Sequence, residues 1–164
     1  MEDEVWNVIP GTNDRYEVST HGRWRRVGYP DVLSIDWKPD RHTPDKIYGY
    51  IRPYINSKPK RILIHRAVAL AHIPNSADKP CVDHINGDCK NNSVQNLRWA
   101  SLTENQMNRR PTAGRSLPKG VYEIRPGRFK ACFRKKHLGV FATVEEAKAA
   151  VDAVGFEYSD FYTP

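Results

Sequence analysis

The sequence predicts an α+β chain made of three small units, and two observations indicate this. Short stretches of aromatic and β-branched residues, typical of strands, are separated by turn residues, and few segments favour helix. The 164 residues also change in character, from a β-rich segment at 1–62, through a mixed segment at 63–110, to a basic segment at 120–164. Residues 111–119 have the composition of a linker between the last two.

The N-terminal segment is expected to contain short strands and turns. Residues 15–19 predict a strand, and the following His21-Gly22-Arg23 predicts a tight turn. Residues 36–46 are rich in Pro, Asp and Lys and predict a loop.

The middle segment predicts a helix, two strands and a second helix. Strong helix formers run from Arg66 to Ala71, and Pro74 ends that helix. Two short strands are expected at 81–84 and 96–100, joined by a polar loop. Ser101 and Glu104 have the spacing of a capping box, which predicts a helix from Ser101 to Arg110. Leu70, Leu97 and Trp99 are expected in the core, and His65 and His72, at helix ends, are interpreted as structural.

The C-terminal segment predicts a small sheet covered by one helix. Strands are expected at 121–124, 129–133 and 138–141, with turns between them. A second capping box, Thr143 with Glu146, opens a helix whose apolar residues share one face.

The charge is uneven along the chain, although its net value is only +7. Residues 1–50 carry 7 basic and 9 acidic side chains, residues 51–110 carry 10 and 4, and residues 111–136 carry 8 and 1. A basic block beside a nearly neutral one is typical of a polyanion-binding protein, although basic surfaces also serve solubility.

The three cysteines argue against a disulfide framework, because their number is small and odd. The acidic N-terminus has no apolar core of a signal peptide, and no stretch approaches membrane-spanning length. We therefore expect a cytoplasmic protein with no membrane partner. Cys81 and Cys89 could form a zinc site with His84, but the absence of a Cys-x-x-Cys pair favours a zinc-free site.

Four polar residues in the middle segment form a pattern that suits phosphodiester hydrolysis. His84 can deprotonate water, because its ordinary pKa lies near physiological pH. Asp83 and Asn105 offer oxygen ligands that match Mg²⁺ or Mn²⁺, and Asn96 can bond across the hairpin and hold the His84 loop. Each residue alone is weak evidence, so the prediction depends on the ordered set in a strand–strand–helix unit.

These residues resemble the HNH motif of phage homing endonucleases. The resemblance covers residues 63–110 and includes Asp83-His84-Ile85-Asn86-Gly87-Asp88, Asn91-Asn92, Asn96-Leu97-Arg98-Trp99-Ala100, Glu104-Asn105 and Asn108. It implies a ββα-metal HNH finger with His84 as general base, Asn96 as the hairpin-stabilising residue, and Asp83 and Asn105 as metal ligands. The third motif position is Asn rather than His, which occurs in this subfamily.

The flanking segments resemble modules that accompany such enzymes. Residues in 1–62, among them Trp6, Tyr16-Glu17-Val18-Ser19 and Gly22, resemble a NUMOD4-like element that contacts DNA. Residues 120–158 are similar to an AP2-type domain, which lays its sheet into the DNA major groove. Because several relatives end in a helix-turn-helix module instead, the target site and cutting geometry cannot be carried over from them.

Eight basic residues are candidates for DNA contact. Strand alternation places Arg128, Lys130 and Arg134 opposite Phe129, Ala131 and Phe133. A solvated sheet face is the alternative interpretation. The candidates are Arg98, Arg109, Arg110, Arg125, Arg128, Lys130, Arg134 and Lys136.

The sequence thus predicts a site-specific, metal-dependent endonuclease that cuts double-stranded DNA. Nicking is expected from one active site in one chain, and a monomer is favoured over a dimer. A phage or prophage source, in a bacterial host cell, is implied by the resemblance. The alternative is a non-catalytic DNA-binding regulator in which the AP2-like domain binds DNA and the HNH finger is only structural.

Overall fold

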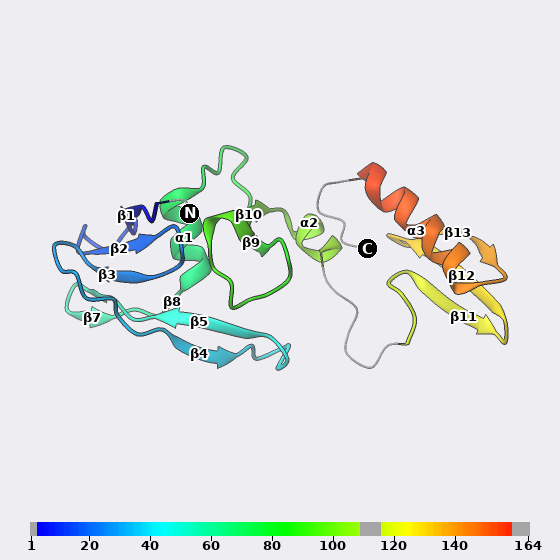
Figure 1. The fold of residues 1–164 in the computed structure, drawn as a ribbon, viewed down its shortest axis with the longest axis horizontal. Coiled ribbons are helices and arrows are strands. Elements are labelled where there is room, and N and C mark those ends of the chain that lie inside the picture. Colours follow the sequence, from blue (N-terminus) through cyan, green and yellow to red (C-terminus); the bar gives the residue numbers. More distant parts are fainter. Residues whose placement is uncertain (1–2, 109–115, 159–164) are drawn as a thin grey trace. The chain divides into compact units, whose positions relative to one another are not determined.

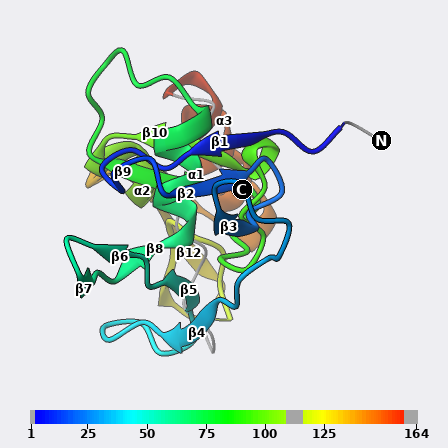
Figure 2. The same ribbon diagram turned by 90° about the vertical axis from the view of Figure 1, so that its left-hand side faces the viewer.

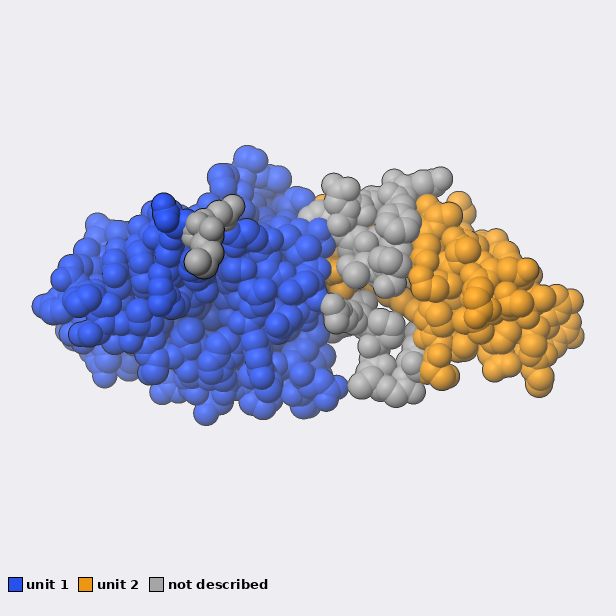
Figure 3. Space-filling model, in the orientation of Figure 1, with its two compact units in different colours: residues 1–102 blue, residues 103–164 orange. Residues whose placement is uncertain are grey.

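The computed structural model describes residues 3–108 and 116–158, and the chain divides into two compact units, residues 1–102 and 103–164 (Figure 3). Both units combine small antiparallel sheets with few helices, as expected for an α+β chain. The predicted boundaries after residues 62 and 110 stay predictions. Arg109 and Arg110 lie outside the described residues.

Unit 1 contains four small antiparallel sheets (Figures 1 and 2). The first joins β1 (Trp6–Val8), β2 (Tyr16–Ser19) and β3 (Trp24–Arg26). The second joins β4 (Asp36–Pro39), β5 (Ile47–Ile51) and β8 (Ile62–Leu63). The remaining two are hairpins, β6 (Tyr54–Ile55) with β7 (Lys58–Pro59), and β9 (Cys81–His84) with β10 (Leu97–Ala100).

One helix, α1 (Ile64–His72), joins these sheets into a single core. It packs against β1 and β2, against β5 and β8, and against β9 and β10, and Figure 1 shows it among them. The core therefore combines buried residues from the predicted N-terminal and middle segments. They are Ile9, Tyr16, Val18, Trp24, Ile51, Ile64, Ala67, Val68 and Leu97. Because a buried apolar core stabilises whatever it joins, residues 1–62 and the β9–β10 hairpin stand as one structural unit.

The β9–β10 hairpin carries the predicted chemical residues. Its register pairs His84 with Leu97 and Asp83 with Arg98. Trp99 is buried, and its indole N–H donates to the Ile73 carbonyl at 2.9 Å. The hairpin is thus anchored to the end of α1 on the face that carries Trp99 and His84, and Asp83 lies on the opposite face.

Unit 2 contains a three-stranded antiparallel sheet and a long helix (Figure 1). The strands are β11 (Val121–Arg125), β12 (Arg128–Phe133) and β13 (Lys136–Phe141), and the helices are α2 (Leu102–Met107) and α3 (Val144–Tyr158). Ala147 and Val151 of α3 pack on Val121, Ala131 and Phe133.

The capping box predicted at the start of α3 is confirmed. The Glu146 N–H donates to the Thr143 hydroxyl at 3.2 Å, and the Glu146 carboxylate accepts from the Thr143 N–H at 3.3 Å. The two side chains therefore satisfy N–H groups that a helix start leaves without partners.

Three local predictions were wrong. Residues 36–39 form strand β4 rather than loop, because pairing with β5 supplies backbone partners to a segment with little intrinsic strand preference. Asn96 ends a short 3₁₀ turn (Val94–Asn96), so β10 begins one residue later than expected. Leu70 is 50% exposed, because it lies on the outer side of α1.

Within the described residues, no helix is long and apolar enough to span a membrane.

Candidate active site and DNA-binding surfaces

His84 lies at the end of β9, buried and held by a hydrogen bond. Its Nε2 lies 3.1 Å from the Asn92 Oδ1 atom. The Asn92 amide nitrogen donates to the Lys90 carbonyl at 3.0 Å, so its oxygen faces the imidazole and can only accept. Nε2 therefore carries the proton of neutral His84, which leaves the lone pair on Nδ1. This is the tautomer that a general base acting through Nδ1 requires.

The surroundings of His84 favour its neutral form. Burial is the main cause of a pKa below the ordinary value of 6.5, because the charged imidazolium loses solvation. The hydrogen bond to Asn92 and the charge of Asp83 oppose this shift. The net effect keeps His84 unprotonated, and so able to accept a proton, at neutral pH.

Asp83 is buried beside His84 and forms an ion pair across the hairpin. Its Oδ2 accepts from Arg98 Nε at 2.9 Å, which the direct cross-strand register makes possible. Such a charge-assisted bond fixes both side chains. Arg98, predicted to contact DNA phosphate, is thus engaged with the predicted metal ligand in this structure.

Asn96 holds the loop between the two strands at both ends. Its side-chain oxygen accepts from the Asn86 N–H at 3.0 Å, and its amide nitrogen donates to the Asn91 carbonyl at 2.8 Å. Its own carbonyl accepts from the Ile85 N–H at 2.8 Å. One buried amide therefore stabilises the loop that positions Asn92 against His84.

Asn105, the second predicted metal ligand, lies half-buried in α2 and belongs to unit 2. Asp83, His84 and Asn96 belong to unit 1, so joint ligation by Asp83 and Asn105 stays a prediction. The donor chemistry fits Mg²⁺ or Mn²⁺, which take carboxylate and amide oxygens together with water and substrate phosphate. A carboxylate has four lone-pair sites, so the bond from Arg98 does not exhaust the capacity of Asp83.

Two residues that matter for this arrangement had no assigned role in the sequence prediction. Asn92 was quoted only as part of the motif, although it is the hydrogen-bond partner of His84. Gly22 lies in the turn between β2 and β3 with φ +80°, and a Cβ there would come within 2.9 Å of the Asn92 Cβ. Only glycine fits this contact. No sequence signal links two residues 70 positions apart.

The basic candidates of unit 2 lie mainly on the sheet face away from α3. Along β12, Ala131 and Phe133 are buried under the helix, while Arg128 is exposed and Lys130 half-buried on the opposite face. Arg134 differs from the prediction, because it lies in the β12–β13 turn with φ +47° rather than on the strand face. Arg125 and Lys136 are exposed at strand ends.

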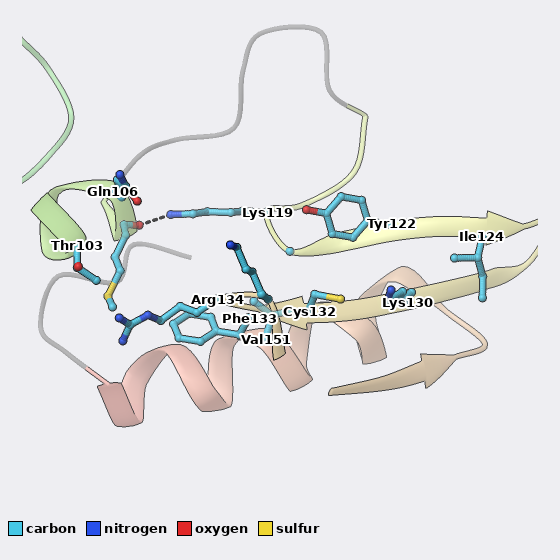
Figure 4. A pocket seen from close by; sticks show the side chains of 13 residues that line it. Thr103, Gln106, Lys119, Tyr122, Ile124, Lys130, Cys132, Phe133, Arg134 and Val151 are labelled. Carbon is cyan, nitrogen blue, oxygen red and sulfur yellow. Dashed lines mark hydrogen bonds between the residues drawn. The ribbon is translucent and has the colours of Figure 1, made fainter. Parts of the chain in front are cut away.

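The same face also presents apolar side chains. Tyr122 and Val140, which flank Lys130 in the register, are 49% and 45% exposed. Part of this face lines a pocket of about 710 Å³ in unit 2 (Figure 4). Lys119, Lys130 and Arg134 line the pocket, and Lys119 Nζ donates to the Met107 carbonyl. The mixture of cations with apolar side chains differs from an ordinary solvated face.

Unit 1 carries a second basic surface, which the sequence prediction did not single out. The β6–β7 hairpin projects from the body of the unit (Figure 2) and exposes Lys58, Lys60 and Arg61. Its turn residues, Asn56 and Ser57, have φ of +51° and +62°, the pattern of a type I′ hairpin turn. The hairpin, called here the basic hairpin (residues 54–61), contains no acidic residue.

Contacts with the rest of unit 1 hold the basic hairpin in place. Asn13 donates to the Asn56 side-chain oxygen at 3.0 Å. The Arg61 guanidinium lies 3.6 Å from the centre of the Tyr50 ring, a cation–π contact. The positive charges are therefore presented on a fixed support.

Comparison with known proteins identifies the family of the middle segment. Residues 63–107 match the family model described as HNH endonuclease. We call residues 63–107 the HNH domain, after the family model that they match. The HNH domain contains the β9–β10 hairpin, Asp83, His84, Asn96 and Asn105.

Similar proteins in viruses carry the same domain. An uncharacterised HNH endonuclease of Acanthamoeba polyphaga mimivirus, L247, is 34% identical over 63% of this chain and 25% of its own length. A second, L245, is 27% identical over 91% of this chain and 42% of its own length. The DNA endonuclease I-HmuI of Bacillus phage SP01 is 33% identical over 63% of this chain and 58% of its own length.

A solved structure agrees with this assignment. The HNH homing endonuclease I-HmuI, in a structure that describes its DNA binding and cleavage, superposes with a TM-score of 0.52 at 28% identity. The match covers 66% of this chain and 57% of that one. The chain thus spans between a quarter and three fifths of the length of these relatives. The comparisons support the HNH domain and leave the NUMOD4-like and AP2-like resemblances of the flanks as predictions.

Proposed function

We propose that this protein is a divalent-metal-dependent DNA endonuclease that uses His84 as general base. The observation that carries the proposal is the buried His84 in an HNH domain, with its proton fixed on Nε2 by Asn92. A merely structural hairpin has no need of a neutral imidazole held in one tautomer beside a buried carboxylate.

The reaction is hydrolysis of a phosphodiester bond. His84 Nδ1 accepts a proton from water as the water oxygen attacks phosphorus, and the bond from phosphorus to the leaving sugar oxygen breaks. His84 gains a positive charge in this step, which neighbouring Asp83 stabilises. Asn92 keeps the ring oriented throughout, because its oxygen accepts from Nε2–H in both the neutral and the charged forms.

Asp83 and Asn105 would hold a Mg²⁺ or Mn²⁺ ion. When bound, the cation neutralises charge on the phosphate and on the leaving oxygen. Arg98, bonded to Asp83, keeps the carboxylate oriented in the hairpin. The two flanking regions would bind duplex DNA, with the basic hairpin of unit 1 and the basic sheet face of unit 2 as contact surfaces.

We also propose site-specific cleavage and a homing role, which rest on the likeness to I-HmuI. One HNH domain in one chain favours cutting one strand for each binding event. Supercoiled plasmid should therefore pass through an open-circle form. Direct conversion of supercoiled to linear DNA would contradict nicking but leave the endonuclease proposal standing.

The deciding experiment is plasmid cleavage with Mg²⁺ or Mn²⁺ by the wild type, by His84→Ala and by His42→Ala, an exposed histidine of the same unit. We expect cleavage by the wild type and by His42→Ala, and none with a chelator. His84→Ala should lose about 100- to 10,000-fold in rate and keep its affinity for DNA.

The opposite outcome would favour a regulator. If the wild type binds a DNA site tightly and specifically but cuts no DNA with either metal, the HNH domain is a scaffold. Cleavage that survives His84→Ala would instead overturn the assignment of the base.

A further inference from the structure

Three aromatic rings from three different elements meet at His84. Tyr48 comes from β5, His65 from the first turn of α1, and His84 from the end of β9. The ring centres of His65 and His84 lie 5.0 Å apart at an interplanar angle of 70°, an edge-to-face contact. Tyr48 lies 5.4 Å from His65 and 6.2 Å from His84. These distances are within the range of interacting aromatic pairs.

The backbone next to these rings allows the close approach. Gly49 follows Tyr48, and a Cβ at Gly49 would come within 2.9 Å of the Ile64 side chain and 2.7 Å of Ile35. Any larger residue would push α1 away from β5. Because Ile64 precedes His65, this contact also determines how near His65 comes to Tyr48.

Within the part of the chain that the structure describes, the buried His65 ring contributes through packing and not through a hydrogen bond of its Nδ1 atom. His65 is 6% exposed, and its Nδ1 is buried with no hydrogen-bond partner among the described residues. An unpaired buried polar atom destabilises a fold, whereas a phenylalanine or leucine would carry no such atom. Burial also lowers the pKa of His65 to about 3, so the ring is neutral at any working pH.

We propose that Tyr48 and His65 are positioning residues for His84, a proposal that rests on the function proposed above. The bond from Nε2 to Asn92 holds one atom of the His84 ring, and rotation of the ring about its Cβ–Cγ bond would move Nδ1. Rings packed against His84 from β5 and α1 restrict that rotation and aim Nδ1. A neutral neighbour is also required, since a charged one would repel the imidazolium that forms when His84 takes its proton.

The consequence is that the catalytic unit extends beyond the HNH domain. Tyr48 lies outside residues 63–107 and within the segment predicted to contact DNA. The N-terminal region would therefore supply part of the active-site support as well as a DNA-binding surface.

Four variants test the proposal, each measured for kcat at saturating DNA, for DNA affinity and for thermal unfolding. Tyr48→Leu and His65→Leu remove a ring, whereas Tyr48→Phe and His65→Phe retain one. We expect the Leu variants to lose about 10- to 100-fold in kcat with unchanged DNA affinity, because small displacements of a catalytic group cost this much. The Phe variants should regain most of the loss. Tyr29→Leu, an exposed tyrosine of the same unit, is the matched control.

A second measurement does not depend on cleavage. The Nε2–H proton of His84 should give a slowly exchanging NMR signal in the wild type, because it is buried and bonded to Asn92. In a folded His65→Leu variant we expect that signal to broaden or exchange faster. Unchanged kcat or an unchanged Nε2–H signal in the folded Leu variants would overturn the positioning role. If His65→Leu shows the expected change in the Nε2–H signal but the wild type cuts no DNA, the endonuclease proposal is refuted and the ring contact stands.

Discussion

The β9–β10 hairpin and the β11–β13 sheet are both small antiparallel structures, but they treat polar side chains in opposite ways. In the hairpin, Asp83, His84, Asn92 and Asn96 are at most 7% exposed, and their side chains are hydrogen-bonded to one another, to the loop backbone or, for Asp83, to Arg98. In the sheet of unit 2, Arg125, Arg128 and Lys136 extend into solvent.

This difference indicates that the two regions have different functions. Burying polar groups is costly unless each finds a partner, so a buried, bonded cluster is retained where geometry matters, as in a reaction. Exposed cations are not held in one geometry, and they attract a polyanion through their charge. Changes in the hairpin should therefore alter the rate of cleavage, and changes in the sheet should alter the salt dependence of binding.

The largest effect is expected for Asp83→Ala. The substitution removes the predicted metal ligand and leaves Arg98 without its carboxylate partner, so kcat should fall on the order of 100- to 1,000-fold while DNA affinity changes little. Cleavage rates at saturating DNA over a range of Mg²⁺ concentrations measure this. Asp31→Ala, an exposed aspartate elsewhere in unit 1, is the control. Equal rates for the two variants would remove Asp83 from the mechanism.

Smaller effects are expected when each basic surface is neutralised. A triple change of Lys58, Lys60 and Arg61 to Ala, and a second of Arg125, Arg128 and Lys130, should each weaken DNA binding and leave kcat at saturating DNA unchanged. Each phosphate contact contributes about 0.9 to the slope of log affinity against log salt, so a loss of three lowers the slope by about 3.

The control for the first triple variant removes the same charge elsewhere in unit 1. Arg15, Arg41 and Lys90 are exposed and lie outside the basic hairpin. Their triple Ala variant should keep a nearly wild-type slope. If its salt slope falls as much as that of the Lys58, Lys60 and Arg61 triple variant, net charge rather than the basic hairpin explains binding, and the comparison between surfaces fails.

A third prediction concerns acid stability. His65 has a pKa of about 3 in the folded protein against about 6.5 when unfolded, so the unfolded chain takes up its proton first as pH falls. Stability is therefore full above pH 6.5 and decreases below it, by about 3 kcal/mol at pH 4.5 for this one residue. The lowered pKa of His84 acts in the same direction.

Urea unfolding at pH 7.5 and pH 4.5 measures this difference. His65→Phe should reduce it, because the phenyl ring takes up no proton, whereas His42→Phe at an exposed position should not. A wild-type stability that is equal at both pH values would show that His65 is not buried as the structure has it.

Local patterns in the sequence predicted much of the fold and part of the site. The strand at 81–84 and the capping box of Thr143 and Glu146 depend on neighbouring residues, and both are present. Strand β4 was missed because it depends on a partner strand, β5, rather than on its own composition. Contacts between distant segments, such as Gly22 with Asn92 or Tyr48 with His84, leave no periodic signal.

The smallest effect tests whether the capping box at the start of α3 stabilises that helix. Glu146→Ala removes the carboxylate that accepts from the Thr143 N–H and should cost about 1 kcal/mol of helix stability. Glu145→Ala removes the same charge from the same helical turn without touching that bond, so it should cost clearly less. Thermal unfolding compares the two variants. Equal losses would mean that both carboxylates act only through the helix dipole, and that the capping bond adds nothing to the packing of Ala147 and Val151.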